Sequence, residues 1–388
     1  MTNETLRGIR VLDLTRLIPG PFATLLLADL GARVDKIEDP GAGDYLRPMP
    51  PQVGGMSATF VTLNRGKRSA VIDLKKAEGV ALFRRLAART DVIVESFRPG
   101  VMDKLGLGYD VLRADNPRLV YAALTGYGQD GPLSKRAGHD LNYLSRAGVL
   151  GMQGPNGGPP QVPGVQMADV GGGLWCAMGI LAALYARERT GVGRFVDVAM
   201  TDGAMPFGAF GFGPVLASGS SAPRGGDPLS GGIAPYATYR TADGRHVSLA
   251  ALEPKFWIAF CQATGIEIDL GALVPGDHQP KLREQVAGVI GGKTRDEWEA
   301  FAVEHDCCLE PVLEPHELLA DAHAKARGVL VRGPAPNGTE MLQLSTPLVR
   351  DIVPGPAPTH GAHTDAVLAD YGIDATEVAS LRATKIVR

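Results

Sequence analysis

The sequence predicts an α/β protein with a large domain on a parallel, helix-covered sheet and a smaller α+β domain. Three observations lead to this prediction. Strand and helix patterns alternate from residue 9 to residue 124, the pattern changes to a hairpin after residue 236, and stretches rich in glycine and proline interrupt the chain at residues 203–232 and 333–338. The length of 388 residues also favours two domains, because single cores stop growing at a smaller size.

The large domain begins with a βαβ pattern. An apolar strand pattern at residues 9–14 is followed by the loop Pro19-Gly20-Pro21, an apolar helix pattern over 22–30 and a second strand at 34–37. Further strands are expected at residues 69–74, 91–95 and 119–124, with a helix over 79–89. The layout is Rossmann-like, but the first turn lacks G-x-G-x-x-G, which argues against a nicotinamide or flavin dinucleotide.

The second half of the chain contains a long helix and then a different pattern. An apolar helix is expected over residues 170–187, with a stop at the glycines after Thr190. Beyond it the sequence predicts a hairpin at 236–240 and 246–250, helices at 256–264 and 295–304, and two C-terminal helices at 364–371 and 375–381.

Composition excludes several classes of function. The net charge is −3 without a basic stripe, so no nucleic-acid partner is expected. The sequence contains no run of about 18 uncharged apolar residues, which a membrane span would need, so no span is expected. No export signal is expected either. The four cysteines, Cys176, Cys261, Cys307 and Cys308, lack metal spacing, which favours a reducing compartment and a cytoplasmic location.

Eight segments, taken in order, resemble the class III CoA-transferase superfamily, and within it most closely the α-methylacyl-CoA racemases. They are residues 30–38, 63–69, 95–101, 105–109, 125–128, Ala-Gly-His-Asp-Leu-Asn-Tyr at 137–143, Met-Ala-Asp-Val-Gly-Gly-Gly at 167–173 and Ala-Leu-Glu-Pro-Lys-Phe-Trp at 251–257. The resemblance covers nearly the whole chain. One departure is Asp35, where related chains usually carry an apolar residue.

The resemblance implies a large Rossmann-like domain formed by both chain ends, a smaller inserted domain and an interlocked homodimer. Combined with the glycine-rich breaks, it predicts a large CoA-binding domain over residues 1–205, a linker over 206–232, the small domain over 233–330 and a return segment over 331–388.

For the chemistry, the resemblance implies that His139 and Asp169 are the two bases and that Glu253 is the carboxylate partner of His139. Imidazole suits this role because it titrates near neutral pH. Each residue also has a plainer interpretation: a satisfied or surface histidine, a helix N-cap at Asp169, and an exposed charge at Glu253. Asp140 is expected to bond to backbone or to the Asn142-Tyr143 turn.

Three glycines, Gly171, Gly172 and Gly173, follow Asp169, and glycine costs up to about 1 kcal/mol relative to alanine in a helix. We interpret this cost as a sign that a ligand approaches closely. The amide of Asp169 or of its neighbours would then stabilise an enolate oxygen.

The CoA part of a thioester needs cations for its phosphates. The segments that match the family make Arg65, Lys67, Arg68 and Arg98 the candidates, with Arg16 and Tyr143 as further ligand-lining residues, although a short basic cluster is more often solvated surface.

The predicted function is interconversion of (R)- and (S)-2-methylacyl-CoA thioesters through an enolate, with no metal or redox cofactor. One alternative is CoA transfer between carboxylic acids, with Asp169 as the nucleophile of an aspartyl anhydride. Another is a non-catalytic acyl-CoA-binding protein. The acyl group is left open, and Met152, Met167, Met200, Met205 and Phe207 are candidates for an apolar acyl surface.

Overall fold

The structure is a computed structural model that describes residues 4–336, 338–349 and 352–388. The chain forms two compact units. The larger unit contains the chain up to Leu144, together with Gln166–Ala204 and Asp321–Arg388, and the smaller unit contains Ser145–Val165 and Met205–Ala320. Both chain ends therefore belong to the larger unit.

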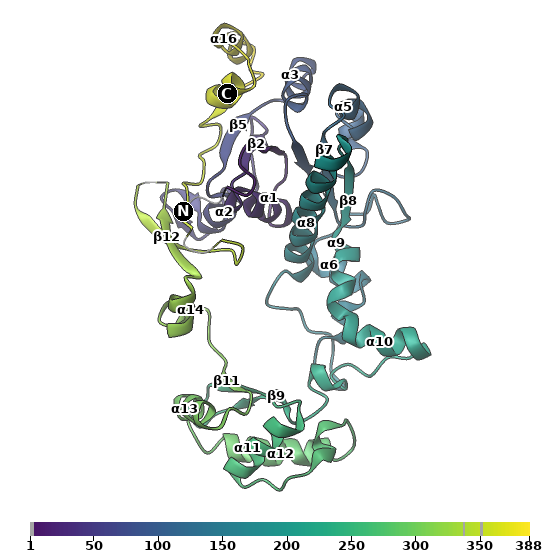
Figure 1. Ribbon diagram of the computed structural model, residues 1–388, viewed down its shortest axis with the longest axis vertical. Helices are drawn as coiled ribbons and strands as arrows, with labels where there is room; N and C mark the ends of the chain where they lie inside the picture. The colour runs from purple at the N-terminus through teal and green to yellow at the C-terminus, as the bar shows by residue number, and fades with distance from the viewer. Residues whose placement is uncertain (1–3, 337, 350–351) are drawn as a thin grey trace. The chain divides into compact units, whose positions relative to one another are not determined.

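A six-stranded parallel sheet forms the centre of the larger unit (Figure 1). Its strands are β1 (Arg10–Asp13), β2 (Arg33–Glu38), β5 (Arg68–Val71), β6 (Val92–Glu95), β7 (Val120–Thr125) and β8 (Phe195–Ala199). The spatial order is β5-β2-β1-β6-β7-β8, and every adjacent pair is parallel. This is the doubly wound Rossmann order, so the predicted fold class is confirmed. The strand β8 was not predicted, since its first residues are exposed and Asp197 interrupts its apolar pattern.

Two helices of the larger unit, α1 (Pro19–Asp29) and α8 (Met167–Thr190), pack against each other. Close approach explains the glycines at the start of α8. A Cβ atom at Gly173 would lie 2.7 Å from the carbonyl oxygen of Pro19, and one at Gly172 would lie 2.6 Å from Cγ of Met200. At these two positions the glycines make room for protein, which differs from the expected approach of a ligand.

The helix α8 ends at Gly191, whose φ of 72° is the left-handed cap that the sequence predicted. It is also long and apolar enough, by length and composition, to cross a membrane. Half of its most apolar window is buried inside the protein, and core helices of soluble proteins meet the same criterion. The expectation that no segment reaches this length and composition is therefore wrong for α8, but the helix is weak evidence for a membrane span.

The larger unit also contains further short strands and helices. They are β3 (Gln52–Val53), β4 (Met56–Ser57), α2 (Ala58–Asn64), α3 (Ala77–Ala87), α4 (Val101–Lys104), α5 (Tyr109–Asp115), α9 (Met200–Ala204), α14 (Ala322–Arg327), β12 (Leu330–Pro334), β13 (Glu340–Leu344), α15 (Thr364–Asp370) and α16 (Ala375–Ala383). The helix α6 (Asp140–Arg146) runs from the larger unit into the smaller one.

The smaller unit contains a three-stranded antiparallel sheet of β9 (Tyr236–Arg240), β10 (His246–Ala250) and β11 (Leu309–Pro311). Its helices are α7 (Val149–Met152), α10 (Ala209–Ser218), α11 (Pro254–Thr264), α12 (Gln279–Ile290) and α13 (Arg295–His305). An aromatic core of Trp257, Phe260, Trp298 and Phe301 joins α11 to α13, because the Phe260 ring contacts the rings of Trp298 and Phe301. The hairpin, α11 and α13 match the predicted positions, whereas α12 was not predicted.

The boundaries of the units differ from the predicted domain ranges in three places. Residues 145–165 group with the smaller unit although they were predicted within the larger domain. The predicted linker over 206–232 contains α10, a ten-residue helix. The return to the larger unit begins at Asp321, ten residues before the predicted position. Glycine and proline led us to expect a linker, but Phe210 and Val215 continue a helical pattern between them.

Candidate active site

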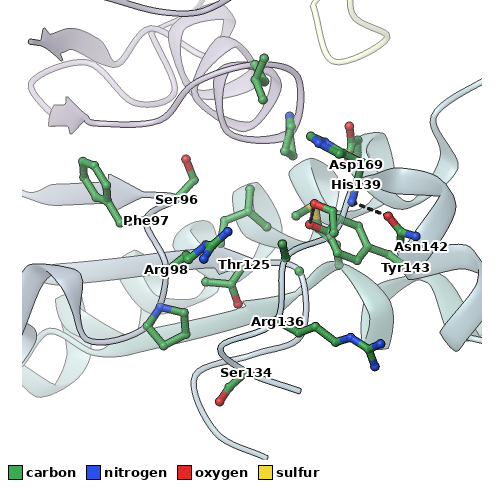
Figure 2. A pocket seen from close by; sticks show the side chains of 18 of the residues that line it. Ser96, Phe97, Arg98, Thr125, Ser134, Arg136, His139, Asn142, Tyr143 and Asp169 are labelled. Carbon is green, nitrogen blue, oxygen red and sulfur yellow. Dashed lines mark hydrogen bonds between the residues drawn. The ribbon is translucent and has the colours of Figure 1, made fainter. Parts of the chain in front are cut away.

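A cavity of about 440 Å³ opens at the carboxyl ends of β1, β6 and β7 in the larger unit (Figure 2). The loop after β1 contributes Arg16, Leu17 and Pro19, and the loop after β6 contributes residues 96–99. The strands β1 and β6 are adjacent, but the chain winds away from them in opposite directions. Ligands of open parallel sheets bind at such a switch point. His139, Asn142, Tyr143 and Asp169 also line this cavity.

His139 is held by the turn that starts α6. Its amide donates to Oδ1 of Asn142 at 3.0 Å, and its carbonyl accepts from the amides of Asn142 and Tyr143 at 2.8 and 3.2 Å. The Tyr143 hydroxyl donates to the carbonyl of Gly138. The imidazole itself is exposed, and no residue that the structure describes hydrogen-bonds to it. The backbone of His139 is therefore fixed while its ring is available to a ligand (Figure 2).

The ring of Tyr143 lies under this turn. A Cβ atom at Gly126 would come within 2.3 Å of the ring, and one at Gly138 within 2.7 Å. Burial raises the pKa of Tyr143 to about 12, so the phenol stays protonated and donates. Tyr143 thus lines the cavity as predicted, and it also holds the segment that carries His139.

Asp169 is the third residue of α8, inside the first turn rather than before it. Burial and then the nearby Asp140 carboxylate raise its pKa to about 7. A carboxyl group that titrates near neutral pH can both accept and donate a proton under physiological conditions. Such a perturbed group in a cleft is a candidate for catalysis.

Asp140 connects the starts of α6 and α8. Its Oδ1 accepts from the amides of Ala168 at 2.7 Å and Asp169 at 3.0 Å, so it caps α8 from another element. The amide of Val170 donates to the carbonyl of Gln166. The predicted backbone bonding of Asp140 is therefore present. The expectation that the amides of Asp169 and its neighbours stabilise an enolate is wrong for these three, because they already have acceptors.

Three arginines line the cavity. Arg98 and Arg136 are exposed, and their guanidinium groups have no hydrogen bond or ion pair with the residues that the structure describes. Arg16 is half-buried and is bonded to Asp39 and Tyr45. Arg16 and Arg98 were predicted as ligand-binding residues, whereas Arg136 was missed. Its position three residues before His139 was the available signal.

The structure gives Arg65, Lys67 and Arg68 protein partners, which differs from their predicted role in phosphate binding. The buried Arg65 side chain pairs with Asp29 at 2.6 Å. The Lys67 ammonium is fully buried and donates to Asn64, Thr24 and the carbonyl of Pro21. Arg68 pairs with Asp35 at 2.6 Å. The unusual acid at position 35 is therefore neutralised from the next strand, and these cations stabilise the fold.

Glu253 lies in the smaller unit, at the N-cap position of α11, and its side chain is exposed and does not cap the helix. Its pairing with His139 stays a prediction. Among the residues that the structure describes, no group of three or more histidines, cysteines and acids is placed to hold a metal ion.

Comparison with known proteins agrees with the fold. A model of CoA-transferase family III matches residues 6–364. The Alpha-methylacyl-CoA racemase of Homo sapiens is 39% identical over 393 residues, covering 98% of this chain and 97% of its own. The Succinate--glutarate CoA-transferase of Agrobacterium fabrum is 34% identical over 387 residues, covering 94% and 95%. The crystal structure of a CAIB/BAIF family protein from Brucella suis matches with a TM-score of 0.81 at 32% identity, covering 94% of this chain and 99% of that one.

Proposed function

Because this chain belongs to CoA-transferase family III and is an enzyme of that family, we propose that it interconverts the (R)- and (S)-forms of 2-methylacyl-CoA thioesters. The observation that carries the proposal is that His139 and Asp169, whose pKa is about 7, line one cavity. Inversion of a carbon needs a base on one face and an acid on the other. A carboxyl group with a pKa of about 7 can exchange these roles with a histidine in either direction of the reaction.

In either direction of the reaction, one of the two groups removes the α-proton. The electron pair of the C–H bond then moves into the thioester, which becomes an enolate. The other group then returns a proton to the opposite face, so the C–H bond is restored with inverted configuration. The enolate oxygen needs a hydrogen-bond donor. We assign this role to the amide of Asp140 at the start of α6, which has no acceptor among the residues that the structure describes.

The CoA phosphates would be bound by the arginines of the same cavity. Arg98 and Arg136 present free guanidinium groups, which form paired hydrogen bonds with phosphate oxygens. Arg16 contributes a third positive charge. The proposed reaction uses no metal or redox cofactor.

We also propose a homodimer in the cytoplasm, in which Glu253 orients His139. Support for a partner chain comes from apolar surface. None of the ten residues of α10 is buried, and Leu216 is 86% exposed. Soluble proteins rarely leave such a helix uncovered.

Transfer of CoA between carboxylic acids is the second candidate, because family members with that name are also similar to this chain over most of its length. In that reaction the Asp169 carboxylate attacks the thioester carbonyl and expels CoA, forming a mixed anhydride. His139 favours racemisation, since the transfer has no need of a second base. A protein that only binds acyl-CoA is a third candidate, and it predicts binding without hydrogen exchange.

The test is incubation of the protein with one enantiomer of a 2-methylacyl-CoA in heavy water, with and without an acceptor carboxylate. We expect α-deuteration and loss of chirality without CoA transfer. The variant His139→Gln should stop both the α-deuteration and the loss of chirality. The variant His316→Gln, in the smaller unit, serves as the control. A new thioester that depends on the acceptor, without α-exchange, would identify a transferase. Binding with neither reaction would identify a carrier.

A further inference from the structure

The loop after β1 carries a strained residue into the cavity. Leu17 has a φ of 65°, in the left-handed region. This conformation is strained for an L-residue other than glycine. Leu17 and its neighbour Arg16 both line the cavity. Contacts elsewhere must therefore hold this part of the loop, which we call the Arg16 arm (residues 15–17).

The backbone of the Arg16 arm is fixed from both sides by a buried ion pair. The Leu17 amide donates to Oδ1 of Asp44 at 3.1 Å. The other oxygen of Asp44 pairs with the Lys36 ammonium at 2.9 Å, and Lys36 donates to the carbonyl of Thr15 at 2.7 Å. Both charged side chains are fully buried. The conformation of Leu17 is thus enforced by groups that cannot move independently of the sheet.

The side chain of Arg16 is held by the segment that supplies Asp44. Its Nη2 pairs with Asp39 at 2.9 Å, and its Nη1 donates to the Tyr45 hydroxyl at 2.9 Å. The guanidinium carbon also lies 5.0 Å from the centre of the Tyr45 ring. A guanidinium group has five N–H donors, so these two bonds leave donors for a ligand. Glu38 anchors this segment in turn, because it accepts from the amide of Asp44 at 2.9 Å.

We propose that Asp39 and Tyr45 are positioning residues of the thioester site, which act on the ligand only through Arg16. The inference rests on the proposed function in one respect, namely that this cavity binds the CoA part of the substrate. A free arginine side chain loses substantial rotamer entropy when a ligand orders it. The contacts with Asp39 and Tyr45 order Arg16 before the ligand arrives, so less affinity is lost on binding.

The experiment is a double-mutant cycle read by calorimetric titration with free CoA. The four proteins are the wild type, Tyr45→Phe, Arg16→Ala and the double variant. We expect Tyr45→Phe to weaken CoA binding about threefold to tenfold, as the loss of one typical hydrogen bond would. Arg16→Ala should weaken it more, and the double variant should bind as Arg16→Ala does, because Tyr45 would have nothing left to position. Asp39→Asn should behave as Tyr45→Phe does.

Tyr185→Phe is the matched control. The Tyr185 hydroxyl bonds to Arg189 at 2.5 Å and its ring lies 4.5 Å from the guanidinium carbon, but this pair does not line the cavity. Its CoA affinity should equal that of the wild type. Additive losses in the cycle would overturn the inference while leaving the CoA site in place. A wild type that does not bind CoA would overturn both the inference and the proposed function. CoA binding without α-exchange would count against the racemase alone.

Discussion

Two groups of charged side chains lie near the carboxyl edge of the same sheet and behave in opposite ways. In the buried cluster of Asp13, Lys36 and Lys67, positive and negative charges are paired. Burial alone would raise the pKa of Asp13, but the two lysines and two threonine hydroxyls bring it to about 2. In the second group, Asp140 and Asp169, burial and then the like charge of Asp140 raise the pKa of Asp169 to about 7.

The difference shows which charges serve the fold and which are available for chemistry. With Asp44, whose carboxylate pairs with Lys36, the buried cluster is internally neutralised, and its side chains are inaccessible, so a ligand has no group to bind there. The Asp140–Asp169 pair is incompletely compensated, and its Asp169 lines a cavity. In the sequence, both groups are charged residues near glycines and prolines. Only the burial and the pairing of their side chains, which the structure shows, distinguish one group from the other.

The largest effect that we expect comes from Lys67→Met. This change leaves Asp13 with less compensation inside the protein and should lower the free energy of unfolding by about 3–5 kcal/mol. Urea denaturation measures the loss, and Lys75→Met, at an exposed position, is the control. If the Lys67→Met protein instead had normal stability but weak CoA affinity, the predicted role of Lys67 in phosphate binding would be supported.

Asp169→Asn should reduce the rate of α-exchange on the order of 10²–10⁴-fold, as expected for a lost acid–base group. It should also remove a pH dependence. Because the folded pKa of Asp169 is above its unfolded value of about 3.8, the folded protein binds the proton more tightly, and stability decreases as pH rises from about 4 to about 7. Denaturation of both proteins at several pH values tests this. Equal slopes would contradict the raised pKa.

Asp140→Asn should have the smallest effect. The amide oxygen of asparagine can still accept from Ala168 and Asp169, so the cap is kept while the charge is lost. The pKa of Asp169 should then fall, although burial keeps it above its usual value. The ascending limb of the pH–rate profile that depends on Asp169 should move to lower pH, with Asp110→Asn, an exposed acid, as the control. An unmoved profile would leave burial as the sole cause of the shift.

Much of the fold was predictable because its signals are local. The apolar runs of β1, β6 and β7 are completely buried or nearly so, and such runs identify strands of a parallel sheet. The strand β8 and the helix α12 escaped prediction because exposed positions weaken their patterns. The helix α10 was hidden by glycine and proline, which usually mark loops.

The site was only partly predictable, for a different reason. His139, Asp169, Arg16, Arg98 and Tyr143 come together as expected, since each follows a strand or starts a helix at one edge of the sheet. The direction of a side chain is not local information. Lys67 and Arg98 are both basic residues in segments that match the family. The structure encloses Lys67 in carbonyl and carboxylate oxygens, whereas Arg98 lines a cavity.

The close contact between Gly173 and the carbonyl of Pro19 has a consequence for protein engineering. The helix α1 follows the Arg16 arm, and the first turn of α8 carries Asp169. Because the two helices are in close contact, a shift of either helix would displace both Arg16 and Asp169. Directed evolution toward new acyl groups should therefore keep positions 172 and 173 as glycine. Libraries are better built at other lining positions, namely Ser96, Phe97, Pro99, Ser134 and Ala137, where substitutions can reshape the cavity while Arg98 and Arg136 are kept for the CoA phosphates.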